Sequence, residues 1–149
     1  TILSYLLLRH IVPAAAPGPR VLVELVDPDN ADLFEARAGE VMVSPMVVSH
    51  MLAQVALRRE LRAVFDELVG ADGPDVAFRS VASLELAGSR SFEQIQAAAA
   101  ARGLIALGVR TPRAGLPRGG VVLNPPREEP IALRGGDDVV VIARPTRAA

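Results

Sequence analysis

The spacing of apolar and polar residues divides the chain into segments with helical and strand character. Apolar residues recur with a helical period over residues 1–12, which predicts a helix there. Proline and glycine mark a loop at 13–19. The apolar, β-branched run at 20–26 predicts a strand buried on both faces, as in a parallel sheet. A short helix that stops at Gly39 and a second strand at 40–45 are expected to follow.

A long apolar helix is expected next. Ser44 can cap its start, with Pro45 at the first helical position, and the pattern extends to about Val69. The apolar residues do not keep to one face, and Arg58 to Glu60 interrupt them. The pattern therefore predicts a helix that is bent or that bridges two lobes. Its two apolar stripes are Val48, Met51, Leu52 and Val55, and then Leu57, Leu61, Val64, Phe65 and Leu68.

Beyond a turn at 70–75 the pattern becomes that of a small α+β lobe. Residues 76–86 predict a strand and its exit. Ser91 and Gln94 match the capping box of a helix that ends at Gly103. Short apolar runs separated by glycine, proline and arginine then predict further strands within 104–110, 121–125, 130–133 and 137–144.

Composition excludes several classes of function. The chain has no cysteine, so it can form neither a disulfide framework nor a thiolate metal site. A net charge of −1 and only five aromatic residues (one Tyr and four Phe) argue against nucleic acid as a partner. The apolar run near the start is shorter than the roughly 20 residues that span a bilayer. We therefore expect a soluble α/β protein.

Two stretches resemble one family of regulatory domains. The first reads "DPDNADLFEARAGEVMVSP" and "VVSHMLAQ" after a strand. It is similar to the second half of the Rossmann-like lobe of the regulator-of-K⁺-conductance (RCK) family, also called TrkA-type domains. The second comprises "LIALGVR", "VVLNP" and a final strand opened by "GGDD". It resembles the small C-terminal lobe of that family. The long helix between the two stretches looks most like the CASTOR/POLLUX type of ion channel.

This resemblance implies a partial Rossmann-like lobe at 1–45, a crossover helix and hinge at 46–75, and a TrkA-C-like lobe at 76–149. It also implies a cytoplasmic module that regulates a potassium or other cation channel. Such a module pairs with copies of itself in a dimer or ring, beneath a membrane-spanning pore domain of the same protein. The family's glycine loop, G-x-G-x-x-G, does not occur in this sequence. We expect either that the chain starts after that unit, as the uncapped helix at Thr1 suggests, or that no nucleotide binds in this lobe.

Three carboxylates, on Asp27, Asp29 and Asp32, directly follow the first predicted strand. The main interpretation is structural: Asp27 caps a helix that starts at Pro28, and the other two favour its positive end. The alternative is a metal site, because the carboxyl ends of parallel strands are where α/β sheets bind ligands. Their hard oxygens suit Ca²⁺ or another cation.

Asp72 and Asp75 offer a second candidate metal site in the predicted turn between the lobes, together with the nearby Asp66 and Glu67. The spacing is not that of an EF-hand loop, so a solvated turn is the simpler interpretation. The "GGDD" segment at Gly135–Asp138 is interpreted as a turn that leads into a strand.

No arrangement of residues typical of catalysis is found, and we predict that the protein is not an enzyme. Two alternatives to an ion-sensing domain stay open. One is a fragment of a nucleotide-dependent Rossmann oxidoreductase, which an upstream glycine fingerprint would reveal. The other is an RCK-like sensor of a nucleotide second messenger, for which Arg110 and Asn124 are the candidate ligand-binding residues.

Overall fold

The computed structural model describes residues 2–11, 22–30, 41–113 and 116–144. The fold mixes helices with several small sheets, as the sequence predicts at the level of its class. The chain divides into two compact units, Thr1–Arg62 and Ala63–Ala149. The predicted loop at 13–19 and most of the predicted short helix before Gly39 lie outside the described residues.

The first unit is built on a short parallel sheet. Strand β1 (Val23–Leu25) pairs with β2 (Val41–Val43), Val23 opposite Val41 and Leu25 opposite Val43, which confirms the predicted parallel pairing. Helix α1 (Ile2–Ile11) contributes Tyr5 to the same small core. That core contains Tyr5, Val23 and Leu25, with Val41 and Val43 packed against it.

Strand β1 is not buried on both faces, so that prediction was wrong. Val23 and Leu25 are buried, whereas Glu24 between them is exposed. The flanking Leu22 and Val26 are 66% and 75% exposed. Side chains alternate between the two faces of a strand. Among the described residues of this unit, only one face of β1 has an apolar partner layer.

The long predicted helix is interrupted and becomes two helices. Helix α2 (Ser44–Leu57) ends where Arg58 takes an extended conformation, with φ −145° and ψ 95°. Helix α3 (Leu61–Val69) begins three residues later, so the polar interruption seen in the sequence breaks the helix rather than bending it. Ser44 does not cap α2. It is the first helical residue, and Val43 occupies the cap position without a side-chain hydrogen bond.

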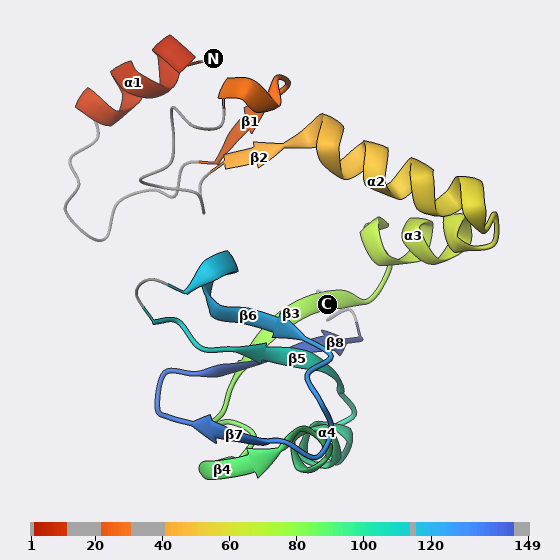
Figure 1. The fold of residues 1–149 in the computed structure, drawn as a ribbon, viewed down its shortest axis with the longest axis vertical. Coiled ribbons are helices and arrows are strands. Elements are labelled where there is room, and N and C mark those ends of the chain that lie inside the picture. Colours follow the sequence, from red (N-terminus) through yellow and green to blue (C-terminus); the bar gives the residue numbers. More distant parts are fainter. Residues whose placement is uncertain (1, 12–21, 31–40, 114–115, 145–149) are drawn as a thin grey trace. The chain divides into compact units, whose positions relative to one another are not determined.

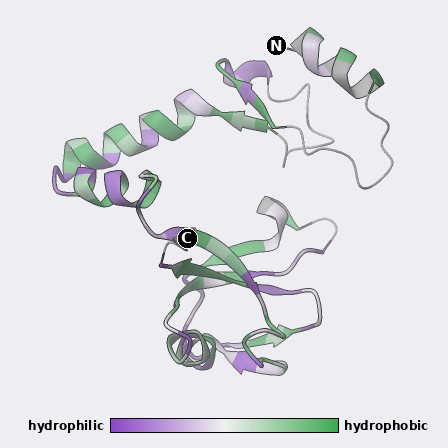
Figure 2. Ribbon diagram, turned by 180° about the vertical axis from the view of Figure 1, so that it is seen from behind, coloured by the Kyte–Doolittle hydropathy of each residue, from purple (hydrophilic) through white to green (hydrophobic). Residues whose placement is uncertain are grey.

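Neither helix contains a buried residue. Five apolar side chains of α2 are about half to four-fifths exposed: Met46, Val47, Val48, Leu52 and Leu57. Hydrophobic and hydrophilic residues alternate along both helices (Figure 2). Met51 and Val55 are partly buried, but most of the apolar surface of α2 stays exposed within the described part of this chain.

The second unit contains an antiparallel sheet in the order β3–β8–β5–β6 (Figure 1). These strands are β3 (Asp75–Ser80), β8 (Asp138–Ala143), β5 (Ile105–Arg110) and β6 (Val121–Leu123). A separate antiparallel pair joins β4 (Gly88–Ser91) to β7 (Pro130–Leu133). Strand β4 was not predicted, whereas the other five described strands of this unit were.

Helix α4 (Phe92–Ala100) begins and ends as its sequence predicts. The Ser91 hydroxyl accepts a hydrogen bond from the Gln94 amide at 3.3 Å, and the Gln94 side chain accepts one from the Ser91 amide at 3.1 Å. Gly103, with φ +71°, follows the helix, and the Leu104 amide reaches back to the Ala99 carbonyl. This is a Schellman end.

The core of the second unit lies between α4 and one face of the large sheet. Strand β8 supplies its centre, because Val139 and Val141 are completely buried. On the helix, Phe92 and Ile95 are 1% and 0% exposed. The remaining buried members of this core are Val81, Leu84, Leu86, Ala99, Ala106, Val109 and Leu133.

Candidate functional site

The carboxylate of Asp27 caps a short turn after β1. Its Oδ1 accepts a hydrogen bond from the amide of Asp29 at 3.0 Å, and the Asn30 amide donates to the Asp27 carbonyl. Pro28–Asn30 form a 3₁₀ turn, so Pro28 is the first residue after the cap. The capping interpretation of Asp27 is therefore confirmed. Asp29 is exposed, and Asp32 lies outside the described residues.

The acidic residues around 66–75 are exposed and spread along the chain. Asp72 lies in the turn after α3, and Asp75 is the first residue of β3. In the part of the chain that the structure describes, no three His, Cys, Asp or Glu side chains gather as a metal site would require. A cation site at either acidic segment therefore stays a prediction, and neither described set supplies the six to eight oxygens of a full Ca²⁺ shell.

Arg110 lies on β5, opposite Asp138 on β8. Its Nε donates to Oδ2 of Asp138 at 2.9 Å, and its Nη2 donates to the same oxygen. The guanidinium carbon also lies 4.2 Å from the centre of the Phe78 ring. The Arg110 guanidinium is thus paired with the Asp138 carboxylate, and one of its faces lies against the Phe78 ring. About a third of its side chain stays exposed.

The "GGDD" segment is the turn that the sequence predicts, and its first carboxylate is structural. Asp137 is only 3% exposed. Its Oδ2 accepts a hydrogen bond from the Arg134 amide at 2.8 Å and pairs with Nη2 of Arg113 at 3.4 Å. Gly136 has φ +95°, which a glycine adopts without strain. Asp137 therefore links the turn before β8 to the segment that follows β5.

An open groove of about 870 Å³ lies beside β6. Its volume is within the range of small-molecule sites, and apolar side chains form most of its walls. Arg113 lines this groove, and its side chain is 44% exposed and forms an ion pair with Asp137. The arrangement suits an apolar molecule that carries an anionic group. The groove is lined by Thr111, Arg113, Leu116, Gly120, Val121, Val122 and Leu123.

The two residues predicted for nucleotide binding flank this groove but do not line it. Arg110 directly precedes Thr111, and Asn124 directly follows Leu123. The strand register puts Arg110 opposite Val121, while the Asn124 amide donates to the carbonyl of Leu107, three residues earlier on β5. The structure thus does not bring the two residues together. Arg113 was missed because nothing in its sequence context distinguishes it from other loop arginines.

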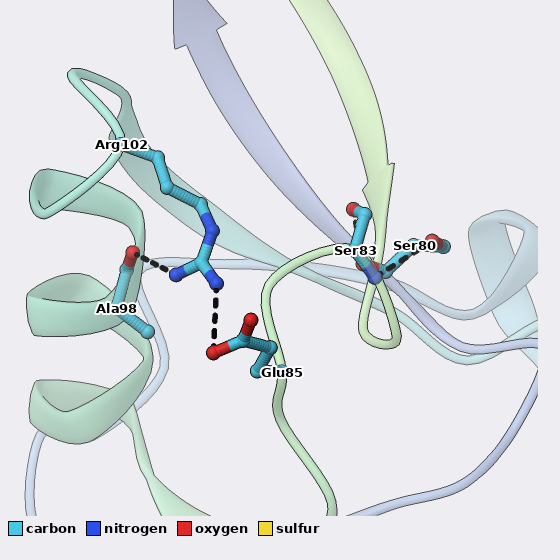
Figure 3. Close-up of polar contacts among 5 residues, drawn as sticks. All are labelled: Ser80, Ser83, Glu85, Ala98 and Arg102. Atoms are coloured by element: carbon cyan, nitrogen blue, oxygen red, sulfur yellow. Dashed lines mark hydrogen bonds and ion pairs between the residues drawn. The ribbon is translucent and has the colours of Figure 1, made fainter.

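Other polar contacts in this unit are structural. Arg102, at the end of α4, reaches Glu85 in an ion pair of 3.2 Å and donates to the Ala98 carbonyl (Figure 3). In the turn after β3, the Ser83 amide donates to the Ser80 hydroxyl. These contacts hold the turn at 81–85 against the end of the helix, and we assign them no role in binding or catalysis.

Comparison with known proteins gives no family for this chain. No protein-family model matches it, and no curated protein sequence matches it at a significant level. Among the residues that the structure describes, no helix has both the length and the apolar character needed to cross a bilayer.

Proposed function

We propose that this protein is a cytoplasmic ligand-sensing domain that regulates a potassium or other cation channel or transporter. In this proposal the first unit belongs to a Rossmann-like lobe of RCK type and the second is a TrkA-C-like lobe. The domain acts as a dimer or larger ring and partners the pore domain of the same full-length protein. It is a regulator rather than an enzyme.

The exposed apolar surface of α2 and α3 is the observation that supports this proposal best. Neither helix has a buried residue, and Leu52 and Leu57 are 64% and 82% exposed. Large apolar surfaces on a water-soluble chain mark interaction sites. A module that works in an assembly has a use for such helices, whereas a self-contained monomeric enzyme does not.

The proposed mechanism is differential binding. A ligand, with Ca²⁺ or another cation as the first candidate, binds one arrangement of the assembly better than another and so shifts its population. The parallel pair β1–β2, with Asp27 and Asp29 at the end of β1, supports this choice of site. Carboxyl ends of parallel strands are where ligands bind in α/β sheets.

Thermal unfolding of the purified chain in a Ca²⁺ titration, with Mg²⁺ as the control, tests this proposal. A ligand at 100 times its dissociation constant stabilises a protein by about 2.7 kcal/mol. We expect a Ca²⁺-selective rise in melting temperature that Asp27→Asn and Asp29→Asn abolish. If Asp72→Asn and Asp75→Asn abolish it instead, the site lies in the turn before β3. No shift at millimolar Ca²⁺ would contradict cation sensing.

The groove beside β6 favours a second candidate, a sensor of a nucleotide second messenger. Its apolar walls and the guanidinium of Arg113 match a molecule with an aromatic base and a phosphate. Titration with a cyclic dinucleotide, ATP and NADH tests this candidate by the same melting measurement. A rise with the cyclic dinucleotide that Arg113→Ala reduces would support it, and a response to NADH alone would favour the oxidoreductase alternative.

A further inference from the structure

Strand β3 is an outer strand of the large sheet, and no described strand pairs with its free side (Figure 1). Its inner side pairs with β8 over all six residues, from Asp75 opposite Ala143 to Ser80 opposite Asp138, without a bulge. Its outer side therefore presents a regular row of backbone amide and carbonyl groups. Such an edge is a template for another strand.

The other outer strands lack this combination of length and regularity. Strand β6, at the opposite edge of the same sheet, has three residues and is followed by Asn124, whose φ is +47°. Strand β7 begins with a proline, and β4 has four residues. Short strands and prolines are the usual protections of an edge. Strand β3 is neither short nor interrupted by proline. Among the described outer strands of this unit, its edge is therefore the most suitable for pairing with another strand.

The side chains of β3 also distinguish its two faces. Ala77 packs against the core, so Asp75 and Arg79 share its face by alternation. Both are exposed, and their neighbours on β8 are Ala143 and Val139, which carry no charge. On the opposite face, Val76 and Phe78 are 58% and 48% exposed.

Two copies of this strand are complementary to each other in one antiparallel register. A strand that pairs with its own copy must place residues of the same face opposite each other, so the symmetry axis passes through a residue. With the axis at Ala77, each Asp75 lies opposite Arg79 of the other copy. Each Val76 then lies opposite Phe78. Opposite charges and apolar–aromatic pairs are both favourable across strands.

We propose that a second copy of this chain binds along the outer edge of β3, antiparallel and with Ala77 opposite Ala77. The two four-stranded sheets then form one continuous sheet of eight strands, four from each copy. The pairing satisfies the free backbone groups of both edges and brings the Val76 and Phe78 side chains of both copies together. It specifies an interface for the self-association in the proposed function and therefore deepens that proposal.

Charge reversal on the full 149-residue chain tests this interface by sedimentation equilibrium. Arg79→Asp places two pairs of like charges across the dimer, and Asp75→Arg does the same with the opposite sign. We expect each single variant to raise the dimer dissociation constant about tenfold or more, because two cross-strand pairs change sign. The double variant, Asp75→Arg with Arg79→Asp, restores both pairs and should return the constant close to its original value.

Arg90→Asp is the matched control for charge. Arg90 is exposed on β4, in the separate two-stranded sheet, so the variant changes net charge by the same amount as Arg79→Asp but leaves the β3 edge intact. Melting curves confirm that each variant is folded. A wild-type chain that stays monomeric at its highest soluble concentration would overturn the proposal. So would single reversals with no more effect than Arg90→Asp, or a double variant that does not recover.

Cysteine cross-linking tests the register itself, and the natural chain contains no cysteine to interfere. A mixture of the Asp75→Cys and Arg79→Cys chains puts the two thiols directly opposite, while the second Asp75–Arg79 pair stays intact. Residues directly opposite each other have Cα atoms about 4.5–5.5 Å apart, which a disulfide can bridge. We expect the mixture to cross-link on oxidation and each variant alone to remain uncross-linked. Equal cross-linking in all three samples would overturn this register.

The sedimentation and cross-linking results are independent of ligand sensing. A dimer through β3 with no melting response to Ca²⁺ or nucleotide would support this interface and contradict the proposed function. A ligand response in a chain whose association ignores Asp75 and Arg79 would do the reverse.

Discussion

Arg110 and Asp138 are 28 residues apart in the sequence and form an ion pair across strands β5 and β8. The side chain of Asp138 is 14% exposed, so the pair is partly withdrawn from water. Strand β3 lies on the other side of β8 from β5, and the ring of its Phe78 lies against the Arg110 guanidinium. These contacts connect three neighbouring strands of the sheet at one end, which makes Arg110 a structural residue as well as a candidate for ligand binding.

We expect this pair to contribute measurably to stability. Arg110→Ala and Asp138→Ala should each destabilise the chain by about 1–2 kcal/mol, because each removes a charged hydrogen-bond partner. A double-mutant cycle measured by chemical denaturation should give a coupling energy of roughly 0.5–1 kcal/mol, the value expected of a partly exposed ion pair. Purely additive effects would show that the pair contributes nothing beyond its separate side chains.

The protein should tolerate asparagine at position 137 better than alanine. Asp137→Ala leaves the Arg134 amide without its acceptor at a buried position, and we expect a loss of about 1–3 kcal/mol in unfolding free energy. Asp137→Asn keeps an acceptor oxygen and loses only the ion pair with Arg113, so its effect should be clearly smaller. Equal losses in the two variants would assign the main role to the charge.

The capping box of α4 should account for about 1 kcal/mol of stability. Ser91→Ala removes the acceptor for the Gln94 amide, and caps of this kind typically contribute that amount. Ser91→Asp provides a carboxylate at the same position and should restore most of it. Thermal unfolding of the two variants beside the natural chain checks this expectation, and an undiminished melting temperature in Ser91→Ala would contradict it.

Gly108 should not accept a larger residue. A Cβ atom there would overlap the carbonyl oxygen of Val122 and lie 2.8 Å from the Cα atom of Leu123 on the paired strand. Gly108→Ala should therefore force β5 and β6 apart and destabilise the chain by about 1–3 kcal/mol. Gly135→Ala is the matched control, because a Cβ atom there meets nothing within 4 Å. We expect that variant to stay within about 0.5 kcal/mol of the natural chain.

Strand β4 shows where sequence patterns fail in this protein. Its four residues are Gly-Ser-Arg-Ser, which have neither apolar alternation nor strand propensity. They are extended because β7 offers a partner, with Gly88 opposite Leu133 and Ser91 opposite Pro130. Pairing with a distant segment overrides local preference, and a local pattern does not contain that information.

The candidate sites also differ in whether they depend on local sequence or on contacts between distant segments. The capping role of Asp27 was predictable, because a carboxylate before a proline at the end of a strand acts on its own next residues. The Asp137 carboxylate was only assigned to a turn. Its burial and its contact with Arg113 depend on how the segment after β5 folds back beside that turn. Arg113 and the groove were not predicted for the same reason.

The sequence alone determined the features that arise within a few residues of one another. These are the helix α4 with its cap and its glycine end, and the strands whose apolar runs match β3, β5 and β8. Each depends on backbone preference, capping or the period of apolar residues, which act locally.

Only the tertiary structure decided which strands are neighbours, which charges meet and which edge stays free. The order β3–β8–β5–β6 brings Arg110 to Asp138 and leaves the outer side of β3 without a described partner. These relationships join residues far apart in the chain. They follow from how the sheet buries Val139 and Val141 against α4, a requirement of the whole unit rather than of any segment.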